Sequence, residues 1–371
     1  KNYLILPTKI FSLQAILMSR IRTHFHTFDA LRLFSFLLVF LHHSPVPESS
    51  PFSYFSKSGG IGVVFFFVLS GFLITYILLE EKVNKGKISL KKFYVRRILR
   101  IWPLFYAMIL FAYLTPYLLD AFHYSYSSEG YQPNWLMSVL FLENYKMMIT
   151  GSFPNVSPLG VMWSLCIEEH FYLIWGILIA TINVKRIPVL ILVSVLLANV
   201  CRIIYMVKGI ATIDIFTNID YFAFGAIPAY LLVFKNEWIG WLEQLPPAIK
   251  YGVAIIAAVL IFLLPHIHYV WVELISPFLL GATFSLLILF TLPPNNCLKI
   301  SDNAWLSRLG VYTYGLYLFH TIVINFFHHT VISQYAWPWF ICISLVVTIL
   351  ISMLSYHIFE KQFLRLKAYF Y

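Results

Sequence analysis

Four ionisable side chains stand inside long apolar stretches of this sequence. Arg32 and His43 belong to FDALRLFSFLLVFLHH, and Glu168 and Glu169 belong to WSLCIEEHFYLIWG. A charged side chain in a membrane span costs on the order of 3 kcal/mol, so its presence there indicates a functional site. Imidazole exchanges protons near neutral pH and can act as a general base. We therefore treat these four residues as the catalytic candidates.

The spacing of Arg32 and His43 places them on one helix face. His43 follows Arg32 by eleven positions, about three turns, so the two side chains would lie roughly 16 Å apart along the helix. His42 would point about 100° away from that face, which favours His43 as the catalytic imidazole. Glu168 or Glu169 could orient this imidazole as a carboxylate does in a catalytic triad. Alternatively, a glutamate could bond a neighbouring helix or pair with an arginine.

Three arginines, Arg96, Arg97 and Arg100, stand where a basic loop meets the third apolar stretch. Guanidinium groups make bidentate contacts with phosphate, so the cluster could bind a phosphorylated cosubstrate such as coenzyme A carrying an acyl group. Lys91 and Lys92 would extend the positive field. The alternative is contact with lipid headgroups, which composition alone favours equally.

Five further side chains are candidates for substrate binding. Trp163 and Ser164 precede the glutamate pair and would line the same cavity, Ser70 stands in a glycine-rich stretch, and Tyr317 and His320 belong to YTYGLYLFH. Neither serine lies in a GxSxG motif, which argues against an acyl-serine mechanism. The glycines around Ser70 favour close helix packing, although they could also border a ligand.

The sequence predicts neither a metal site nor disulfides. Cys166, Cys201, Cys297 and Cys342 lie far apart in apolar surroundings, so we expect buried free thiols. His328 and His329 form a pair without a third ligand in a metal-binding spacing.

Composition identifies the class of protein. Of 371 residues, 60% are hydrophobic and only 11% are charged, against about 25% charged in soluble domains. We predict an all-α integral membrane protein with a bundle of about ten transmembrane helices. The apolar windows lie near residues 28–46, 60–79, 98–119, 159–182, 188–207, 215–234, 251–269, 273–292, 309–331 and 337–359.

The basic residues predict the orientation of these helices. Most fall in alternate connections, including the long loop 80–97, which places both termini in the cytoplasm by the positive-inside rule. The same rule explains the net charge of +10 better than nucleic-acid binding does. The short apolar segment 134–148 contains Glu143 and is expected to be interfacial or re-entrant. We predict a cytoplasmic or interfacial segment 1–27, whose residues before Met18 are an upstream extension or an interfacial helix, a membrane domain 28–363 and a cytoplasmic tail 364–371.

Six ordered motifs across residues 28–363 resemble the membrane-bound acyltransferase family 3. They are FDALRLFSFLLVFLHH, GGIGVVFFFVLSGFLIT, FYVRRILRIWPLFY, MWSLCIEEHFYLIWG, LGVYTYGLYLFH and YHIFEKQF. Bacterial members of this family O-acylate cell-envelope glycans and other carbohydrates.

The resemblance implies roles for several residues. Arg32 and His43 match the family's essential Arg and His, the three arginines match a cytoplasmic motif implied in handling acyl-coenzyme A, and Glu168 and Glu169 match a Trp-Ser-Leu-x-x-Glu-Glu motif. This chain departs from the family at Val64, where Asp is usual, and at His170, where Gln is common.

The resulting hypothesis is a membrane O-acyltransferase, with acetyl-coenzyme A as the expected donor and no permanently bound cofactor. The acceptor would be a hydroxyl of an envelope carbohydrate or a lipid-linked saccharide, and the location the bacterial cytoplasmic membrane, among membrane lipids. Direct transfer and a covalent acyl-histidine relay both remain open. The alternatives are a transporter or flippase, because intramembrane charges also mark translocation pathways, and a structural scaffold.

Overall fold

The computed structural model describes residues 25–121, 123, 129–156, 158–328 and 336–370. Within these ranges the chain is helical, apart from connections and one isolated β-bridge between Tyr131 and Pro154. The prediction of an all-α integral membrane protein is confirmed. The expected segment before residue 25 lies outside the described residues.

Eight helices in the described ranges are long and apolar enough to cross a membrane. They are α4 (Gly59–Lys85), α5 (Leu90–Ala121), α8 (Trp163–Thr181), α9 (Ile187–Lys208) with the helical turn before it, α10 (Ile215–Phe234), α12 (Pro247–Leu263) with the helical turn that extends it to His266, α13 (Val270–Thr291), and α16 (Trp337–Ser355) with its helical continuation to Phe370.

Two further predicted windows form shorter helices. These are α2 (Phe28–His43) and α15 (Thr313–His328), each with 16 residues. Sixteen residues extend about 24 Å, which is less than the roughly 30 Å of a bilayer's hydrocarbon core. The ten expected helices are therefore eight full-length candidates and two shorter ones.

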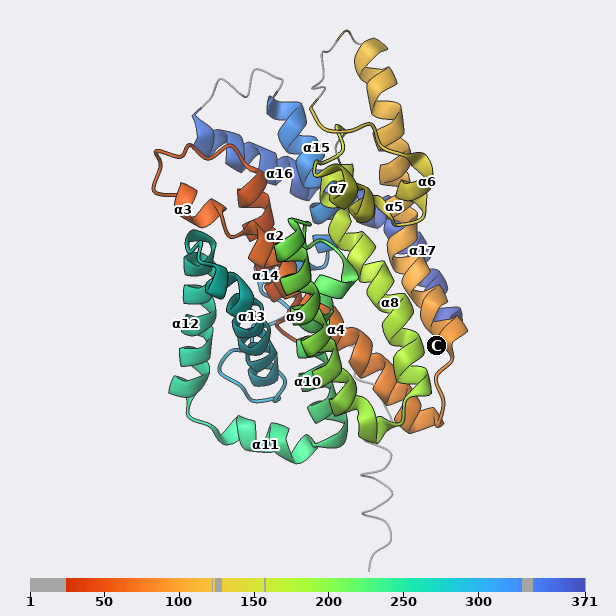
Figure 1. Ribbon diagram of the computed structural model, residues 1–371, viewed down its shortest axis with the longest axis vertical. Coiled ribbons are helices and arrows are strands. Elements are labelled where there is room, and N and C mark those ends of the chain that lie inside the picture. The colour runs from red at the N-terminus through yellow and green to blue at the C-terminus, as the bar shows by residue number, and fades with distance from the viewer. Residues whose placement is uncertain (1–24, 122, 124–128, 157, 329–335, 371) are drawn as a thin grey trace, which may run out of the picture.

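Helices α4 and α10 form the buried centre of the bundle, with α2 beside them (Figure 1). A Cβ atom added to Gly71 would lie 2.1 Å from the carbonyl oxygen of Phe222, and one added to Gly225 would lie 2.0 Å from that of Val68. No side chain fits at such distances, so these glycines allow the two backbones to touch. The packing interpretation of Gly71 is confirmed.

The basic loop expected over residues 80–97 is mostly helical, because α4 continues to Lys85 and α5 begins at Leu90. The charged residues hold this extension in place. Glu81 is buried and accepts a hydrogen bond from Arg96 at 3.3 Å. Lys82 donates to the carbonyl oxygens of Ile179, Ala180 and Ile182 at 2.5–3.1 Å, which satisfies the end of α8.

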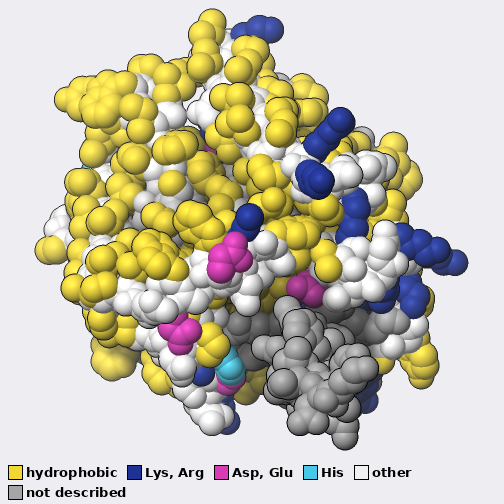
Figure 2. Space-filling view, turned by 90° about the horizontal axis from the view of Figure 1, so that it is seen from below, with side chains coloured by type: hydrophobic (Ala, Val, Ile, Leu, Met, Phe, Trp, Pro, Cys, Tyr) yellow, Lys and Arg dark blue, Asp and Glu magenta, His cyan; other side chains and the backbone are white. Residues whose placement is uncertain are grey.

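We call the end of the bundle that carries Lys82–Lys92 the basic end, and the opposite end, which carries His43, the far end. Figure 2 views the molecule from below, where Lys and Arg side chains follow one edge of a largely hydrophobic surface. Short helices complete the fold: α3 (Ser53–Ser56), α6 (Trp135–Val139), α7 (Glu143–Thr150), α11 (Asn236–Gln244), α14 (Trp305–Gly310) and α17 (Lys361–Leu366).

The segment 134–148 does not form a span, in agreement with the sequence prediction. It forms α6 and the first part of α7, joined by Phe141 in a left-handed conformation (φ 59°). Glu143 is buried and accepts hydrogen bonds from Tyr131 and Ser138, both at 2.5 Å. Through these hydrogen bonds the carboxylate links three parts of the connection between α5 and α8 and so stabilises it.

All four thiols are free, but only Cys166 is buried. The expectation of burial is wrong for Cys297 and Cys342, which are exposed on the protein surface, and Cys201 is half-buried. Cys342 belongs to α16, a peripheral helix that turns most of its side chains outward. Apolar neighbours in the sequence do not distinguish a core position from an outward-facing one.

Candidate functional site

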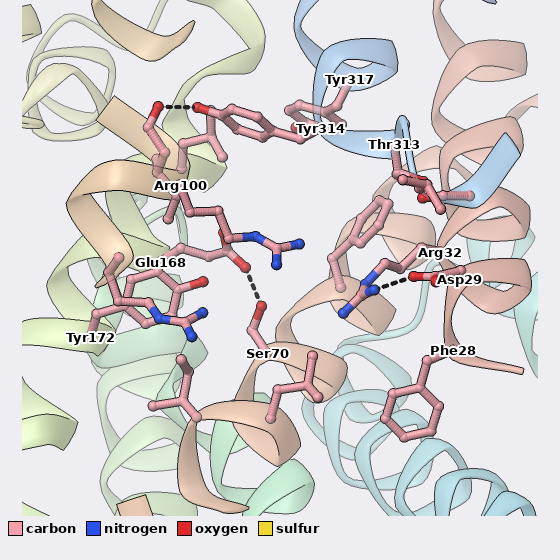
Figure 3. Close-up of a pocket in the computed structure, with 18 of the residues that line it drawn as sticks. Phe28, Asp29, Arg32, Ser70, Arg100, Glu168, Tyr172, Thr313, Tyr314 and Tyr317 are labelled. Atoms are coloured by element: carbon pink, nitrogen blue, oxygen red, sulfur yellow. Dashed lines mark hydrogen bonds and ion pairs between the residues drawn. The ribbon is translucent and has the colours of Figure 1, made fainter. Parts of the chain in front are cut away.

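A central cavity of about 430 Å³ lies between α2, α4, α5, α8 and α15 and is also lined by Tyr356, Glu360, Leu364 and Lys367. Seven residues singled out from the sequence line this cavity: Arg32, Ser70, Arg97, Arg100, Ser164, Glu168 and Tyr317. Five of them, Arg32, Ser70, Arg100, Glu168 and Tyr317, are labelled in Figure 3. Segments from both halves of the chain therefore build one polar space inside an apolar bundle.

The basic end of the central cavity carries three cations. Arg97 and Arg100 come from α5, and Lys367 comes from the turn that follows α17. The guanidinium group of Arg100 points into the open cavity (Figure 3). Phosphate binding is the chemistry that such a cluster supports best.

Arg96 differs from its two neighbours. Its side chain is buried outside the cavity lining, forms an ion pair with Glu81 at 3.3 Å and donates to the carbonyl oxygen of Phe370 at 2.7 Å. Arg96, predicted to contact the donor, therefore does not line the central cavity in this structure. Because successive helix residues point about 100° apart, Arg97 faces the cavity while Arg96 faces α4.

Carboxylates compensate part of the positive charge of the cavity wall. Arg32 donates to Asp29, one turn earlier on α2, at 2.5 Å. Glu168 accepts a hydrogen bond from the hydroxyl of Ser70 on α4 (Figure 3), and Glu360 accepts one from Ser355 at 3.1 Å. These partners hold each charged group in a defined position.

The two adjacent glutamates of α8 lie in different environments. Glu168 lines the central cavity, whereas Glu169 lies outside its lining and accepts from the indole of Trp102 on α5 at 3.2 Å. The structure does not bring either glutamate to His43, whose hydrogen-bond partners are the carbonyl oxygen of Val39 and His320.

Ser164 and Tyr317 close the cavity toward the far end. Their hydroxyl oxygens are 2.7 Å apart, and Tyr317 also donates to the carbonyl oxygen of Val161 at 3.0 Å. Trp163 does not line the cavity, contrary to expectation; its ring faces that of Phe67, with centroids 6.5 Å apart. Of the adjacent pair on α8, only Ser164 reaches the polar space.

His43 and His320 lie beyond Tyr317, outside the cavity lining. Nδ1 of His43 is 2.9 Å from the carbonyl oxygen of Val39 and 3.2 Å from Nε2 of His320. His320 is 0% exposed, and its Nδ1 is 2.7 Å from the carbonyl oxygen of Tyr317. His320, predicted to bind substrate, is therefore enclosed by protein in this conformation and does not line the central cavity.

His42, the alternative to His43, points toward α3 instead of toward His320. Its Nδ1 is 2.9 Å from the carbonyl oxygen of Ser56, in α3. The structure therefore separates the adjacent histidines in the direction that helix geometry predicts.

The two departures from the family pattern do not lie on the cavity lining. Val64 is half-buried and packs against the main apolar cluster, while its neighbour Val63 lines the cavity. The ring of His170 lies 5.6 Å from that of Tyr145 on α7. An apolar side chain suits the surroundings of Val64.

Sequence reasoning gave no site role to three charged residues of the cavity, Asp29, Glu360 and Lys367. Asp29 was detectable, because it stands three positions before Arg32 and such residues face each other on a helix. Lys367 carried no local signal, since only tertiary packing brings it to Arg97 and Arg100. No cluster of three or more possible metal ligands occurs in the described ranges; His329 lies outside them.

Comparisons with known proteins identify the family of this chain. The family model described as an acyltransferase domain, of acyltransferase family 3, matches residues 25–357. The chain is 30% identical over 358 residues to the Bacillus subtilis protein named "Putative peptidoglycan O-acetyltransferase YrhL", covering 90% of this chain and 54% of that one. It is 28% identical over 359 residues to the peptidoglycan O-acetyltransferase OatA of Listeria monocytogenes, covering 91% and 56%.

The chain spans about half the length of the curated relatives it matches. No solved structure gives a significant match. The family match includes α2, the part of the cavity lining between Phe25 and Tyr356, and both His43 and His320. The chain belongs to acyltransferase family 3.

Proposed function

We propose that this protein is a membrane O-acetyltransferase that transfers an acetyl group from acetyl-coenzyme A to a hydroxyl of a cell-envelope carbohydrate. One observation carries the proposal: a single cavity leads from a cluster of cations to Tyr317, and His320 links Tyr317 to the His43 imidazole. Peptidoglycan, named for the relatives, is the first acceptor to test.

The donor would bind with its phosphates at Arg97, Arg100 and Lys367. Arginine forks hold phosphate oxygens in bidentate contacts, and the ammonium group of Lys367 adds a point charge. The pantetheine arm and its thioester would then extend along the cavity past Ser70 and Glu168. Arg32, held by Asp29, lies on the opposite wall and would balance negative charge along this path.

His43 would act as the general base. It removes the proton from the acceptor hydroxyl, the hydroxyl oxygen bonds to the thioester carbonyl carbon, and the carbon–sulfur bond breaks. The proton is then delivered to the leaving thiolate, so that coenzyme A departs as a thiol and the product is an ester. Because His43 lies outside the cavity lining, we propose that the hydrogen bond between Ser164 and Tyr317 opens to let the thioester reach the imidazole.

The basic end would face the cytoplasm, where acyl-coenzyme A is found, and the far end would face the envelope. The Lys and Arg side chains at the basic end support this orientation under the positive-inside rule. We propose the cytoplasmic membrane of a bacterium as the location; both relatives named above are bacterial proteins.

Mass spectrometry of envelope glycans tests the proposal. Cells that express the chain should carry glycans with the acetyl mass increment, and cells without it should lack that increment. Membranes should release free coenzyme A from acetyl-coenzyme A in step with glycan acetylation. Movement of a glycan or lipid without donor consumption would instead identify a transporter or flippase.

A further inference from the structure

Two imidazoles from distant parts of the chain meet at the far end. His43 ends α2, His320 lies within α15, and their ring centroids are 5.0 Å apart. Nε2 of His320 faces Nδ1 of His43 at 3.2 Å. We call these residues the histidine pair.

The proton positions in the histidine pair follow from the backbone. The carbonyl oxygen of Tyr317 can only accept, so Nδ1 of His320, 2.7 Å away, must donate and carry the proton. In neutral imidazole the other nitrogen is then an acceptor. Nε2 of His320 therefore presents a lone pair to His43.

The same argument fixes His43. Its Nδ1 faces two acceptors, the carbonyl oxygen of Val39 at 2.9 Å and Nε2 of His320 at 3.2 Å. This nitrogen must carry the proton, which leaves Nε2 of His43 as the basic atom. The histidine that ends α2 is thereby held in one tautomer.

Packing prevents His320 from leaving this arrangement. The side chain is 0% exposed, and the rings of Phe36, Phe40 and Tyr317 surround it at centroid distances of 5.9, 6.4 and 5.8 Å. A rotated ring would break the hydrogen bond to Tyr317 in apolar surroundings, which is costly. A neutral imidazole can be enclosed there more cheaply than a carboxylate.

We infer that His320 is a positioning residue that holds His43 with its Nδ1 protonated and its Nε2 directed to the acceptor hydroxyl. It takes the place that a carboxylate occupies beside a catalytic histidine. The inference rests on the proposed function, because it assigns His320 a role in the reaction of His43. His320 itself does not contact the substrate.

Three variants test this role: His320→Leu, His320→Gln and His320→Asn. The glutamine amide oxygen can replace the Nε2 acceptor, whereas the asparagine amide reaches only the position of Nδ1 and the carbonyl of Tyr317. Membranes containing each variant are supplied with radiolabelled acetyl-coenzyme A, and acetyl transfer to isolated peptidoglycan is measured as kcat and KM for the donor. Size-exclusion chromatography in detergent checks folding.

We expect kcat to fall about 10- to 100-fold in His320→Leu and His320→Asn, as for other residues that orient a functional imidazole, while KM stays within about twofold. His320→Gln should recover most of kcat. A change in KM alone, equal kcat for the Gln and Asn variants, or full kcat in His320→Leu would each overturn the inference. If the leucine variant does not fold, the comparison of the two amides decides.

His43→Ala separates this inference from the function on which it rests. If that variant is inactive while His320→Leu keeps full kcat, only the positioning role is wrong. If His43→Ala itself keeps full transfer, the proposed mechanism is wrong as well.

Discussion

The central cavity and the histidine pair stabilise polar groups inside a membrane protein in different ways. The cavity gathers charges from several helices and balances them in pairs, such as Arg32 with Asp29. The histidine pair uses two neutral rings anchored by backbone carbonyls. Positive side chains suit an anionic ligand, because the negative charge of the ligand balances them. A general base instead needs a lone pair that is held in one position.

The largest effect is expected at the histidine pair. His43→Ala should lower kcat about 10²- to 10⁴-fold, the usual contribution of a general base, and leave KM for acetyl-coenzyme A nearly unchanged. Acetyl transfer to peptidoglycan measures this effect. His42→Ala is the matched control, because His42 contacts Ser56 instead, and it should retain transfer within about threefold. Loss of transfer in the His42 variant alone would reverse the assignment.

In the cavity, removal of a positively charged side chain should change KM for the donor more than it changes kcat. Arg100→Ala should raise KM for acetyl-coenzyme A about 10- to 100-fold, since a hydrogen bond to a charged group contributes about 1.5–3 kcal/mol. Steady-state kinetics with varied donor concentration would measure it. Arg365→Ala is the control: this arginine is exposed, bonds Gln362 and does not line the cavity. Similar KM values in both variants would contradict donor binding by Arg100.

For the adjacent glutamates, Glu168 and Glu169, we expect smaller effects, but the two variants can be compared directly. Glu168→Gln should reduce kcat/KM about tenfold, because it removes the charged acceptor of Ser70 from the cavity wall. Glu169→Gln should stay within about twofold, since Glu169 lies outside the cavity lining and bonds Trp102. The ratio of the two kcat/KM values is the measurement. Equal losses would mean that the cavity lining does not define the functional surface.

The smallest effect is expected at Lys367. Lys367→Ala should raise KM for acetyl-coenzyme A about three- to tenfold, because a single ammonium group supplies a point charge rather than a bidentate contact. Donor titration again measures it, with Lys361→Ala, which does not line the cavity, as the control. An unchanged KM for Lys367→Ala would show that the turn Lys367–Phe370 does not contribute to donor binding.

Local patterns in the sequence were sufficient for the membrane bundle. The window predicted over residues 215–234 coincides with α10, because a run of apolar residues has to become a buried or membrane-spanning helix. The preference for His43 over His42 also came from helix geometry alone, and the structure directs the two rings to different partners. The length of α4 was underestimated, because hydropathy ends where Glu80 begins although the helix continues.

The sequence by itself determined the class of protein, the approximate helices and the set of residues that could do chemistry. Only the tertiary structure decided which of them share a site. The rotation of α5 separates Arg96 from Arg97, and that of α8 separates Glu168 from Glu169. The pairing of His43 with His320 joins residues 277 positions apart. Such choices depend on how helices are turned and packed against one another, and hydropathy along a single chain does not encode that.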